Sequence, residues 1–541
     1  MDYRLIAAIW GRLIIRVSCV LLIPFFYALW ECLSGLAGGG IWAGWSGSGV
    51  YAFAITSIIS FGLGGVLIVT GSQRQESLPV AEGAVLLALF FAYMTVLGML
   101  PYYSSGRFDF LDAFLESVSG FTTTGMTILP DDIPAAFVLW RSLTQWLGGL
   151  SILVALVTVL LPLGGAFGLV LPEGSRAPMS RLLTSMSRLA SRVALTYIMI
   201  TAALFLLFLL AGAGLFDAFN LAMVIVSTGG AYTIADRTLV GGFALPVALM
   251  LGMLVSSGNF LLYYEAARRR SVTNLLRYAE FRAFLLIIGV AGLLMGCSLW
   301  ASGVYRPLHA MERGMFEAIS FATTTGLSTT EYLSWPHFTR YCMLLLVFVG
   351  GCIGSSSGGM KVARVVIMAK TLLGELKKTL HPQAFTPVYL GRQSIAPATL
   401  NRILGFFFLF VFVLFVGVVL ISLVSNLPLM ESFMLGVACL SSVAAAAKLA
   451  GASAIFSFYP PMLKLVCALL MMIGRLEIFA FFLLFGAMKS ALEKERNDTS
   501  RHYNEQEAKA RRLRELREAR ALSDSQSGSS FFQRLKGGDK Q

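Results

Sequence analysis

The chain has 541 residues, of which 57% are hydrophobic and 13% are charged, against roughly 25% charged residues in soluble globular domains. Its 42 lysines and arginines outnumber its 29 acidic residues, which leaves a formal net charge of +13. This composition excludes a disordered chain, a coiled coil and almost every soluble fold, because one aqueous core could not bury so many long apolar runs. The sequence therefore predicts an integral membrane protein.

Long apolar runs follow one another along the chain. A helix that crosses the hydrocarbon core of a bilayer needs about 20 apolar residues. Ten runs predict such helices, over residues 8–34, 50–70, 82–101, 136–162, 191–213, 242–264, 283–302, 339–370, 400–424 and 460–488. Four shorter apolar runs lie between them, over residues 109–121, 215–227, 311–322 and 430–442. A dozen residues are too few to cross a bilayer, so the shorter runs predict re-entrant half-helices.

Most of the 42 basic residues fall in segments that ten crossings would place on one side of the membrane. The main clusters lie in 1–16, 171–192, 262–283, 361–402 and 489–541. Since cytoplasmic loops carry the excess of lysine and arginine, we expect both termini to be cytoplasmic. Nucleic-acid binding has no support, because topology alone accounts for the basic clusters.

The four half-helices belong to an internal repeat. The copies read LDAFLESVSGFTTTGMT, FDAFNLAMVIVSTGGAYT, RGMFEAISFATTTGLST and MESFMLGVACLSSVAAAA, and each lies between two long apolar runs. The repeating unit is therefore helix, half-helix with loop, helix. We predict an all-α membrane protein with four pseudo-symmetric helix–pore-helix–helix repeats around a central pore. Two N-terminal helices (1–78) precede repeats at 79–172, 173–272, 273–385 and 386–490, and a charged cytoplasmic tail (491–541) follows.

The loops after the half-helices suggest a cation pathway. A half-helix that stops in mid-membrane directs its partly negative C-terminal end at the centre, and backbone beyond it must line a cavity because lipid cannot satisfy it. Four loops of Thr-Thr-Gly type around one axis would form rings of oxygens that replace the hydration shell of a cation. Acids in or before the half-helices are expected to concentrate cations at the outer mouth; they are Asp109, Asp112, Glu116, Asp217, Glu312, Glu317 and Glu431.

At these residues the sequence resembles the Trk/Ktr superfamily of potassium uptake proteins, specifically the bacterial Trk-type translocating subunit. The matching segments include ESVSGFTTTGMTIL, WRSLTQWLGGLSILV, VSTGGAYT, FATTTGLSTT, GGCIGSSSGGMKVAR and IGRLEIFA. The resemblance implies potassium uptake across the bacterial cytoplasmic membrane by a homodimer that cytosolic nucleotide-binding subunits regulate. It also implies a potassium-binding filter at Thr123, Thr124, Gly125, Ser227, Thr228, Gly229, Gly230, Thr324, Thr325, Gly326, Val443 and Ala444. Coupling to sodium or protons, as in symport, stays open, as does the ligand that controls the gate.

The fourth copy departs from the family pattern, which usually has glycine where this chain has Ala444. Alanine can enter the left-handed region at a cost of roughly 1 kcal/mol more than glycine. Lys448, four residues later, would oppose cation entry unless an acid pairs with it. A poorly selective or sodium-permeable channel of the same fold is therefore the main alternative, and we expect Ala444→Gly to sharpen selectivity for potassium.

Two features are candidates for a gate. The run 339–370 contains Gly350, Gly351, Gly354, Ser355, Gly358 and Gly359. Glycine costs about 1 kcal/mol against alanine in a helix interior, so we expect this helix to break below the third filter loop, where the resemblance implies an obstructing loop. Arg475 lies within an apolar run, and its family counterpart faces the pore. Close helix packing through small residues and a buried structural ion pair are the alternatives, although Glu477 at i,i+2 is poorly placed to pair with Arg475.

Other classes of function find little support. A membrane-embedded enzyme would need paired acids, a His/Cys site or an acidic metal site near one interface, and none is present in the sequence. The four histidines do not stand at metal-ligand spacing, and the seven cysteines contain no CxxC. We therefore expect no cofactor, with potassium as the transported ion. The tail beyond residue 490 predicts a solvated helix followed by a Ser/Gly-rich segment, with contact to anionic lipid or a regulatory subunit as alternatives.

Overall fold

The structure is a computed structural model that describes residues 3–35, 49–71, 80–130, 133–157, 179–230, 244–270, 275, 278–383, 386–391, 393–449, 456, 459–476, 478 and 509. Residues Asp2–Leu483 form one compact unit, and everything below concerns this unit. Leu484–Gln541 falls in a second unit, of which only Lys509 is described. The predicted helical tail therefore lies outside the described residues.

Long apolar helices make up most of the unit, as predicted. They are α1 (Tyr3–Gly35), α3 (Val50–Thr70), α4 (Val80–Ser104), α6 (Ala135–Ala155), α7 (Met179–Leu210), α12 (Ala279–Ala301) and α16 (Pro397–Val424). Among the described residues, six helices are long and apolar enough to cross a membrane, or seven when one bent pair of helices is included. Large apolar side chains such as Ile58, Leu210 and Phe408 are exposed on them, which suits contact with lipid rather than water. The fold is that of an all-α membrane protein.

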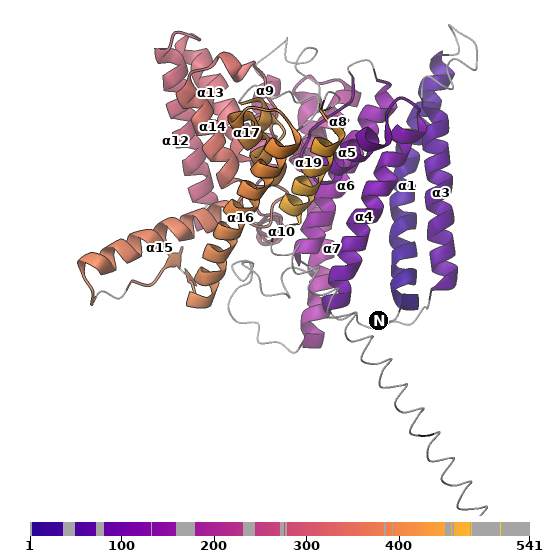
Figure 1. Ribbon diagram of the computed structural model, residues 1–541, viewed down its shortest axis with the longest axis horizontal. Coiled ribbons are helices and arrows are strands. Elements are labelled where there is room, and N and C mark those ends of the chain that lie inside the picture. The colour runs from indigo at the N-terminus through magenta and orange to yellow at the C-terminus, as the bar shows by residue number, and fades with distance from the viewer. Residues whose placement is uncertain are drawn as a thin grey trace, which may run out of the picture. The chain divides into compact units, whose positions relative to one another are not determined.

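The four predicted half-helices are present. They are α5 (Phe110–Phe121), α8 (Leu215–Val226), α13 (Pro307–Ala322) and α17 (Leu429–Ser441), and all four lie in the upper part of Figure 1. Each packs against the long helix that precedes it: α4, α7, α12 and α16, respectively. Each also packs against the helix that follows it: α6, α9 (Ala244–Ser256), α14 (His337–Val349) and α19 (Pro461–Arg475), respectively. The fourfold repeat in the sequence is therefore a fourfold repeat in packing.

One predicted span is not continuous. We expected a single helix over 242–264, but α9 ends at Ser256 and α10 (Phe260–Arg269) leaves it at an angle of 95°. The break has a local cause, because the side chain of Asn259 accepts hydrogen bonds from the backbone N–H groups of Leu261 and Leu262 and so starts a new helix. The prediction of one continuous span was wrong at this point.

The predicted interruption of 339–370 is present, between α14 and α15 (Val362–Leu380). A hairpin of β1 (Tyr389–Leu390) and β2 (Gln393–Ser394), paired antiparallel, then leads to α16. A four-residue helix, α18 (Ala445–Lys448), follows α17, and α19 ends at Arg475. Of the predicted span 460–488, residue 477 and those after 478 lie outside the described residues.

Candidate functional site

Each half-helix ends in a loop with the same backbone geometry. We name these segments loop 1 (122–126), loop 2 (227–230), loop 3 (323–327) and loop 4 (441–444). The second residue of each loop adopts positive φ, at 52° in Thr123, 54° in Thr228, 60° in Thr324 and 56° in Ser442. Residues other than glycine rarely adopt this conformation, and a β-branched threonine there is an outlier. Strained backbone of this kind concentrates at functional sites, so its recurrence in four loops points to the loops as one site.

Backbone hydrogen bonds fix this geometry in the same way each time. The third residue of every loop donates its N–H to a carbonyl five residues earlier in the helix. The pairs are Thr124 with Ser119, Gly229 with Val224, Thr325 with Ser320 and Val443 with Ala438, at 2.9 to 3.0 Å. This is a Schellman-type helix end, which usually has glycine at the left-handed position. At this left-handed position, where a helix end usually has glycine, the four loops have a side chain with a hydroxyl.

The fourth position separates loop 4 from the others. Gly125, Gly230 and Gly326 have φ of 81°, 66° and 70°, whereas Ala444 has φ −55° and ψ −38°. Alanine can enter the left-handed region at a small cost, but Ala444 does not do so. The chain instead stays right-handed and continues directly into α18, the conformation in which a Cβ meets no penalty.

The loops contact one another. The N–H of Ala444 donates to the carbonyl of Thr124 at 2.9 Å, which joins loop 4 to loop 1. A Cβ added to Gly326 would lie 3.4 Å from Val443 of loop 4, and one added to Gly230 would overlap the carbonyl oxygen of Thr325 in loop 3. Loop 2 therefore contacts loop 3, loop 3 contacts loop 4, and loop 4 contacts loop 1.

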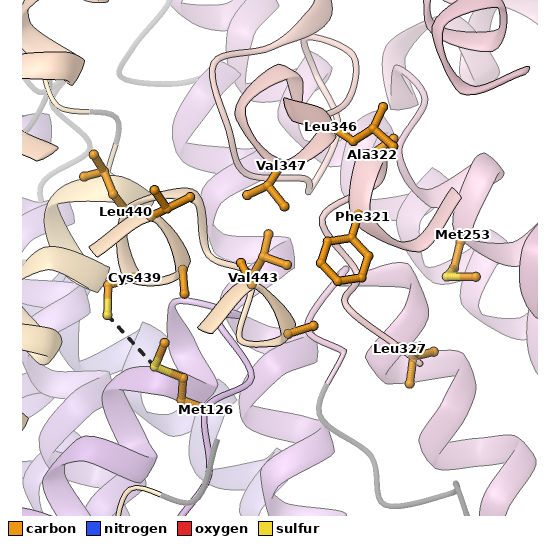
Figure 2. Close-up of a cluster of buried hydrophobic side chains, with 14 of the residues drawn as sticks. Met126, Met253, Phe321, Ala322, Leu327, Leu346, Val347, Cys439, Leu440 and Val443 are labelled. Carbon is orange, nitrogen blue, oxygen red and sulfur yellow. Dashed lines mark hydrogen bonds between the residues drawn. The ribbon is translucent and has the colours of Figure 1, made fainter. Parts of the chain in front are cut away.

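The side chain of Val443 packs against loop 3 near Gly326 and against the apolar core beside it. It is fully buried in the apolar core together with Phe321 of α13 and Val347 of α14. Figure 2 shows Val443 in the middle of this cluster, with the contact between Cys439 and Met126 beside it. Val443 therefore joins loop 4 to repeat 3 through an apolar contact, and only its backbone has polar groups to offer a cation.

Loops 1 and 3 are braced from behind by buried glutamates. Glu116 accepts the backbone N–H of Ile128 at 2.9 Å, and Glu317 accepts that of Thr329 at 3.2 Å. Thr127 and Ser328 each follow the glycine of their loop by two residues. Their hydroxyls donate to Glu116 and Glu317, respectively. Loops 2 and 4 have leucines at the corresponding positions, Leu221 and Leu435. We expected Glu116 and Glu317 at the outer mouth, but both side chains are buried, so for these two acids the expectation was wrong.

Two ion pairs lie close to loop 1. The guanidinium of Arg141 on α6 pairs with Glu116 at 3.3 Å, and its Nη2 donates to the carbonyl of Gly125 at 3.4 Å. Asp112 pairs with Lys464 of α19, so one predicted mouth acid already has a cationic partner. Neither Arg141 nor Lys464 was predicted as part of the site, because an ion pair between segments far apart in the chain leaves no local pattern in the sequence.

Loop 4 is also held by an aromatic side chain from repeat 3. The hydroxyl of Tyr332 donates to the carbonyl of Ala445 at 2.8 Å. Burial raises the pKa of Tyr332, and the carboxylates of Glu317 and Glu331 raise it further. The phenol therefore stays protonated and remains a donor. Lys448 is exposed at the end of α18 and forms no ion pair with any residue that the structure describes.

The second part of the site is the non-helical segment 350–361 between α14 and α15, which we name the interrupted segment. Gly350, Gly354 and Gly359 have φ of 67°, 80° and 72°. A Cβ on Gly351 would overlap Ser257, and one on Gly358 would overlap the carbonyl of Ser441, so these two glycines allow close approach. The hydroxyl of Ser355 donates to the carbonyl of Cys352 at 2.6 Å.

The break between α9 and α10 receives this segment. Cys352 donates its N–H to the carbonyl of Ser257 at 3.0 Å, and Phe260 donates its N–H to the carbonyl of Gly354 at 3.1 Å. The two irregular segments thus form hydrogen bonds with backbone groups that are not paired within a helix and that lipid could not pair. Glu280, buried in the first turn of α12, accepts the N–H of Ile353 at 2.6 Å. The SSGN sequence at 256–259 is the signal that could have revealed the break.

The interrupted segment is bonded directly to the loops. Ser356 donates its hydroxyl to the carbonyl of Val226 at 2.8 Å, and its own carbonyl lies 3.0 Å from the hydroxyl of Thr228. Gly358 donates its N–H to the hydroxyl of Thr324 at 2.8 Å. Arg475, only 4% exposed, donates from Nη1 to the same carbonyl of Ser356 at 2.7 Å. Ser356 therefore joins loop 2, the interrupted segment and Arg475. Nothing in the sequence distinguishes it from the two serines on either side.

A small cavity lies beside the interrupted segment and reaches loop 4 at Ser442. Its volume is about 30 Å³, and Gly354, Ser357, Lys361, Ser442 and Arg475 are among the residues that line it. A space of this size holds one or two water molecules, not an open path for hydrated ions. The amine of Lys361 donates to the carbonyl of Ser357. Two basic side chains, those of Lys361 and Arg475, thus line one cavity with Ser442 of loop 4, where the sequence predicted only Arg475.

Comparison with known proteins agrees with this architecture. The family model for TrkH, described as a cation transport protein, matches residues 50–495. The Trk system potassium uptake protein TrkH of Halomonas elongata is 29% identical, over 90% of this chain and 98% of its own length. TrkG of Escherichia coli K12, also a Trk system potassium uptake protein, is 31% identical over 81% of this chain and 91% of its own.

A solved structure shares the fold. The crystal structure of the potassium transporter TrkH from Vibrio parahaemolyticus aligns with a TM-score of 0.76 and 27% identity, over 90% of this chain and 98% of that one. Because the relatives are transporters and the family match spans most of the chain, a membrane-embedded enzyme is excluded. The chain belongs to the TrkH family of cation transport proteins.

Proposed function

We propose that this protein takes up potassium across the bacterial cytoplasmic membrane, with loops 1 to 4 as its selectivity filter. The observation that carries the proposal is the left-handed residue shared by Thr123, Thr228, Thr324 and Ser442, in four loops that touch one another. A left-handed residue turns successive carbonyls toward the same side of the chain, and four such loops supply the oxygens that replace a cation's hydration shell. The partly negative ends of the four half-helices add to the attraction.

The interrupted segment and Arg475 form the gate in this proposal. The segment lies directly beneath the loops, and Arg475 holds it there through the carbonyl of Ser356. A buried positive charge on the pathway repels a cation, and the segment also blocks the path sterically. Opening requires the segment to leave and the Arg475 bond to break.

The assembly is also a proposal. The names of the relatives place them in a Trk potassium uptake system. The family resemblance of the sequence implies a homodimer that cytosolic nucleotide-binding subunits regulate. We place both termini in the cytoplasm on the strength of the positive-inside rule. The four repeats, 79–172, 173–272, 273–385 and 386–490, would then each contribute one loop to the pathway.

A poorly selective, sodium-permeable channel of the same fold is the second candidate. The right-handed Ala444 favours this candidate, because loop 4 then differs in backbone conformation from the other three loops at the same position. A ring with one displaced member discriminates less between ions of different size.

Growth and flux measurements test the proposal. Expression in a bacterial host that lacks its own potassium uptake systems should restore growth on low potassium, and Gly125→Asp or Gly326→Asp should abolish that growth. Uptake of labelled rubidium in competition with potassium and with sodium then separates the two candidates. Equal competition by sodium would favour the poorly selective channel, and growth that survives both glycine variants would overturn the filter assignment.

A further inference from the structure

The left-handed threonines of loops 1, 2 and 3 occupy equivalent positions, but their hydroxyls have different partners. The hydroxyl of Thr228 lies 3.0 Å from the carbonyl of Ser356 and 2.7 Å from that of Ser227. The hydroxyl of Thr324 accepts the N–H of Gly358 at 2.8 Å. The hydroxyl of Thr123 is buried and has no partner among the described residues. Two of the three hydroxyls therefore bond to the interrupted segment, and the single hydrogen of the Thr228 hydroxyl is shared between the carbonyls of Ser227 and Ser356.

These contacts connect the two functional parts of the site through short bonds. Ser356 and Gly358 are two residues apart in the interrupted segment, and they reach two neighbouring loops that touch each other at Gly230 and Thr325. The carbonyl of Ser356 accepts from both Thr228 and Arg475, so a loop residue and the gate arginine share one acceptor. The segment cannot leave without breaking its bonds to loops 2 and 3.

We propose that Thr228 and Thr324 are positioning residues that fasten the closed gate to the filter, so that opening the gate also changes the cation affinity of loops 2 and 3. The inference rests on the proposed function, since it assigns a second role to filter residues. Linkage makes the effect reciprocal: if gate position alters the affinity of the loops, then cation occupancy of the loops biases gate position by the same factor. Loop 1, with an unbonded Thr123 hydroxyl, is outside this coupling.

The three threonines supply a matched set of variants. Thr228→Val, Thr324→Val and Thr123→Val each replace a hydroxyl with a methyl group of the same shape at an equivalent filter position. Only the first two remove a bond to the interrupted segment, and the loss of one neutral hydrogen bond shifts an equilibrium by about fivefold. Thr228→Ser and Thr324→Ser keep the hydroxyl and serve as rescue variants for a valine that disturbs folding.

The experiment measures rubidium influx into proteoliposomes with the full-length protein, and reports the maximal rate and the half-saturating concentration separately. Thr228→Val and Thr324→Val should each raise the maximal rate about fivefold and shift the half-saturating concentration, and their serine counterparts should behave as the native protein does. Because Thr228 and Arg475 share an acceptor, Thr228→Val should add less than fivefold to Arg475→Ala. For Thr123→Val, the measured quantity is the ratio of influx without Arg475→Ala to influx with it. This ratio should equal that of the protein with Thr123.

The possible failures are distinguishable. If all three valine variants change influx by the same amount, the coupling is overturned while the filter assignment stands. If none of the three changes influx, half-saturation or the preference for rubidium over sodium, the proposed filter itself is overturned. Full additivity of Thr228→Val with Arg475→Ala would contradict the shared acceptor.

Discussion

The backbone N–H of Ala444 donates a hydrogen bond to the carbonyl oxygen of Thr124 at 2.9 Å, so the fourth repeat is joined to the first by main-chain atoms. Ala444 itself is right-handed, with φ −55° and ψ −38°. A carbonyl that accepts a hydrogen bond holds its cation less strongly. Residue 444 thus acts on a carbonyl of loop 1 as well as on its own loop.

Ala444→Gly should increase the preference for potassium over sodium. Glycine enters the left-handed region about 1 kcal/mol more easily than alanine, which corresponds to roughly a fivefold change in the population of the symmetric loop. The measurement is the ratio of potassium to sodium in competition against labelled rubidium uptake. Ala446→Gly, the same chemical change within α18, is the control and should leave the ratio unchanged. Identical ratios in both variants and the native protein would contradict the prediction.

Gly230→Ala should abolish uptake, whereas Gly326→Ala should reduce it only in part. A Cβ at Gly230 overlaps the carbonyl oxygen of Thr325, and backbone cannot move aside as a flexible side chain can. At Gly326 the nearest atom would lie 3.3 Å away, so the cost is mainly the roughly 1 kcal/mol of left-handed strain. Growth on low potassium and rubidium influx, normalised to protein in the membrane, check the order. A Gly230→Ala variant that transports as well as Gly326→Ala would refute the close approach.

Glu116→Gln should destabilise the protein much more than Glu317→Gln. Glu116 forms a buried pair with Arg141, and removal of one partner from such a pair costs about 3–5 kcal/mol. No arginine pairs with Glu317 at such a distance among the described residues, and a glutamine carbonyl can still accept from Ser328 and Thr329. Thermal unfolding in detergent provides the measurement.

The double variant Glu116→Gln with Arg141→Gln is the control for this comparison. It leaves no buried charge unpaired, so it should recover part of the stability that either single variant loses. Equal losses for Glu116→Gln and Glu317→Gln would mean that the ion pair contributes nothing beyond its hydrogen bonds.

The sequence predicted the repeats, the half-helices and the break after α14, because each depends on local signals: apolar length, TTTG repetition and glycine density. It left the conformation of Ala444 undecided, and in the structure this residue is right-handed and donates its N–H to Thr124. The prediction of one continuous helix failed at 242–264, where Asn259 begins a new helix. The interrupted segment forms hydrogen bonds with the backbone at this break, which lipid could not do. Ser356 and Arg141 were missed because their roles depend on residues more than 15 positions away.

Arg475→Ala should raise uptake by about tenfold. The substitution removes a charged hydrogen bond to Ser356, which contributes roughly 1.5–3 kcal/mol, and it also removes the positive charge beneath the loops. Arg475→Lys keeps the charge and one donor, so its uptake should lie between those of the native protein and Arg475→Ala. The measurement is the initial rate of rubidium influx at equal protein in the membrane. Loss of uptake in Arg475→Ala at a normal protein level would instead assign Arg475 a structural role, as in the alternative of a buried ion pair.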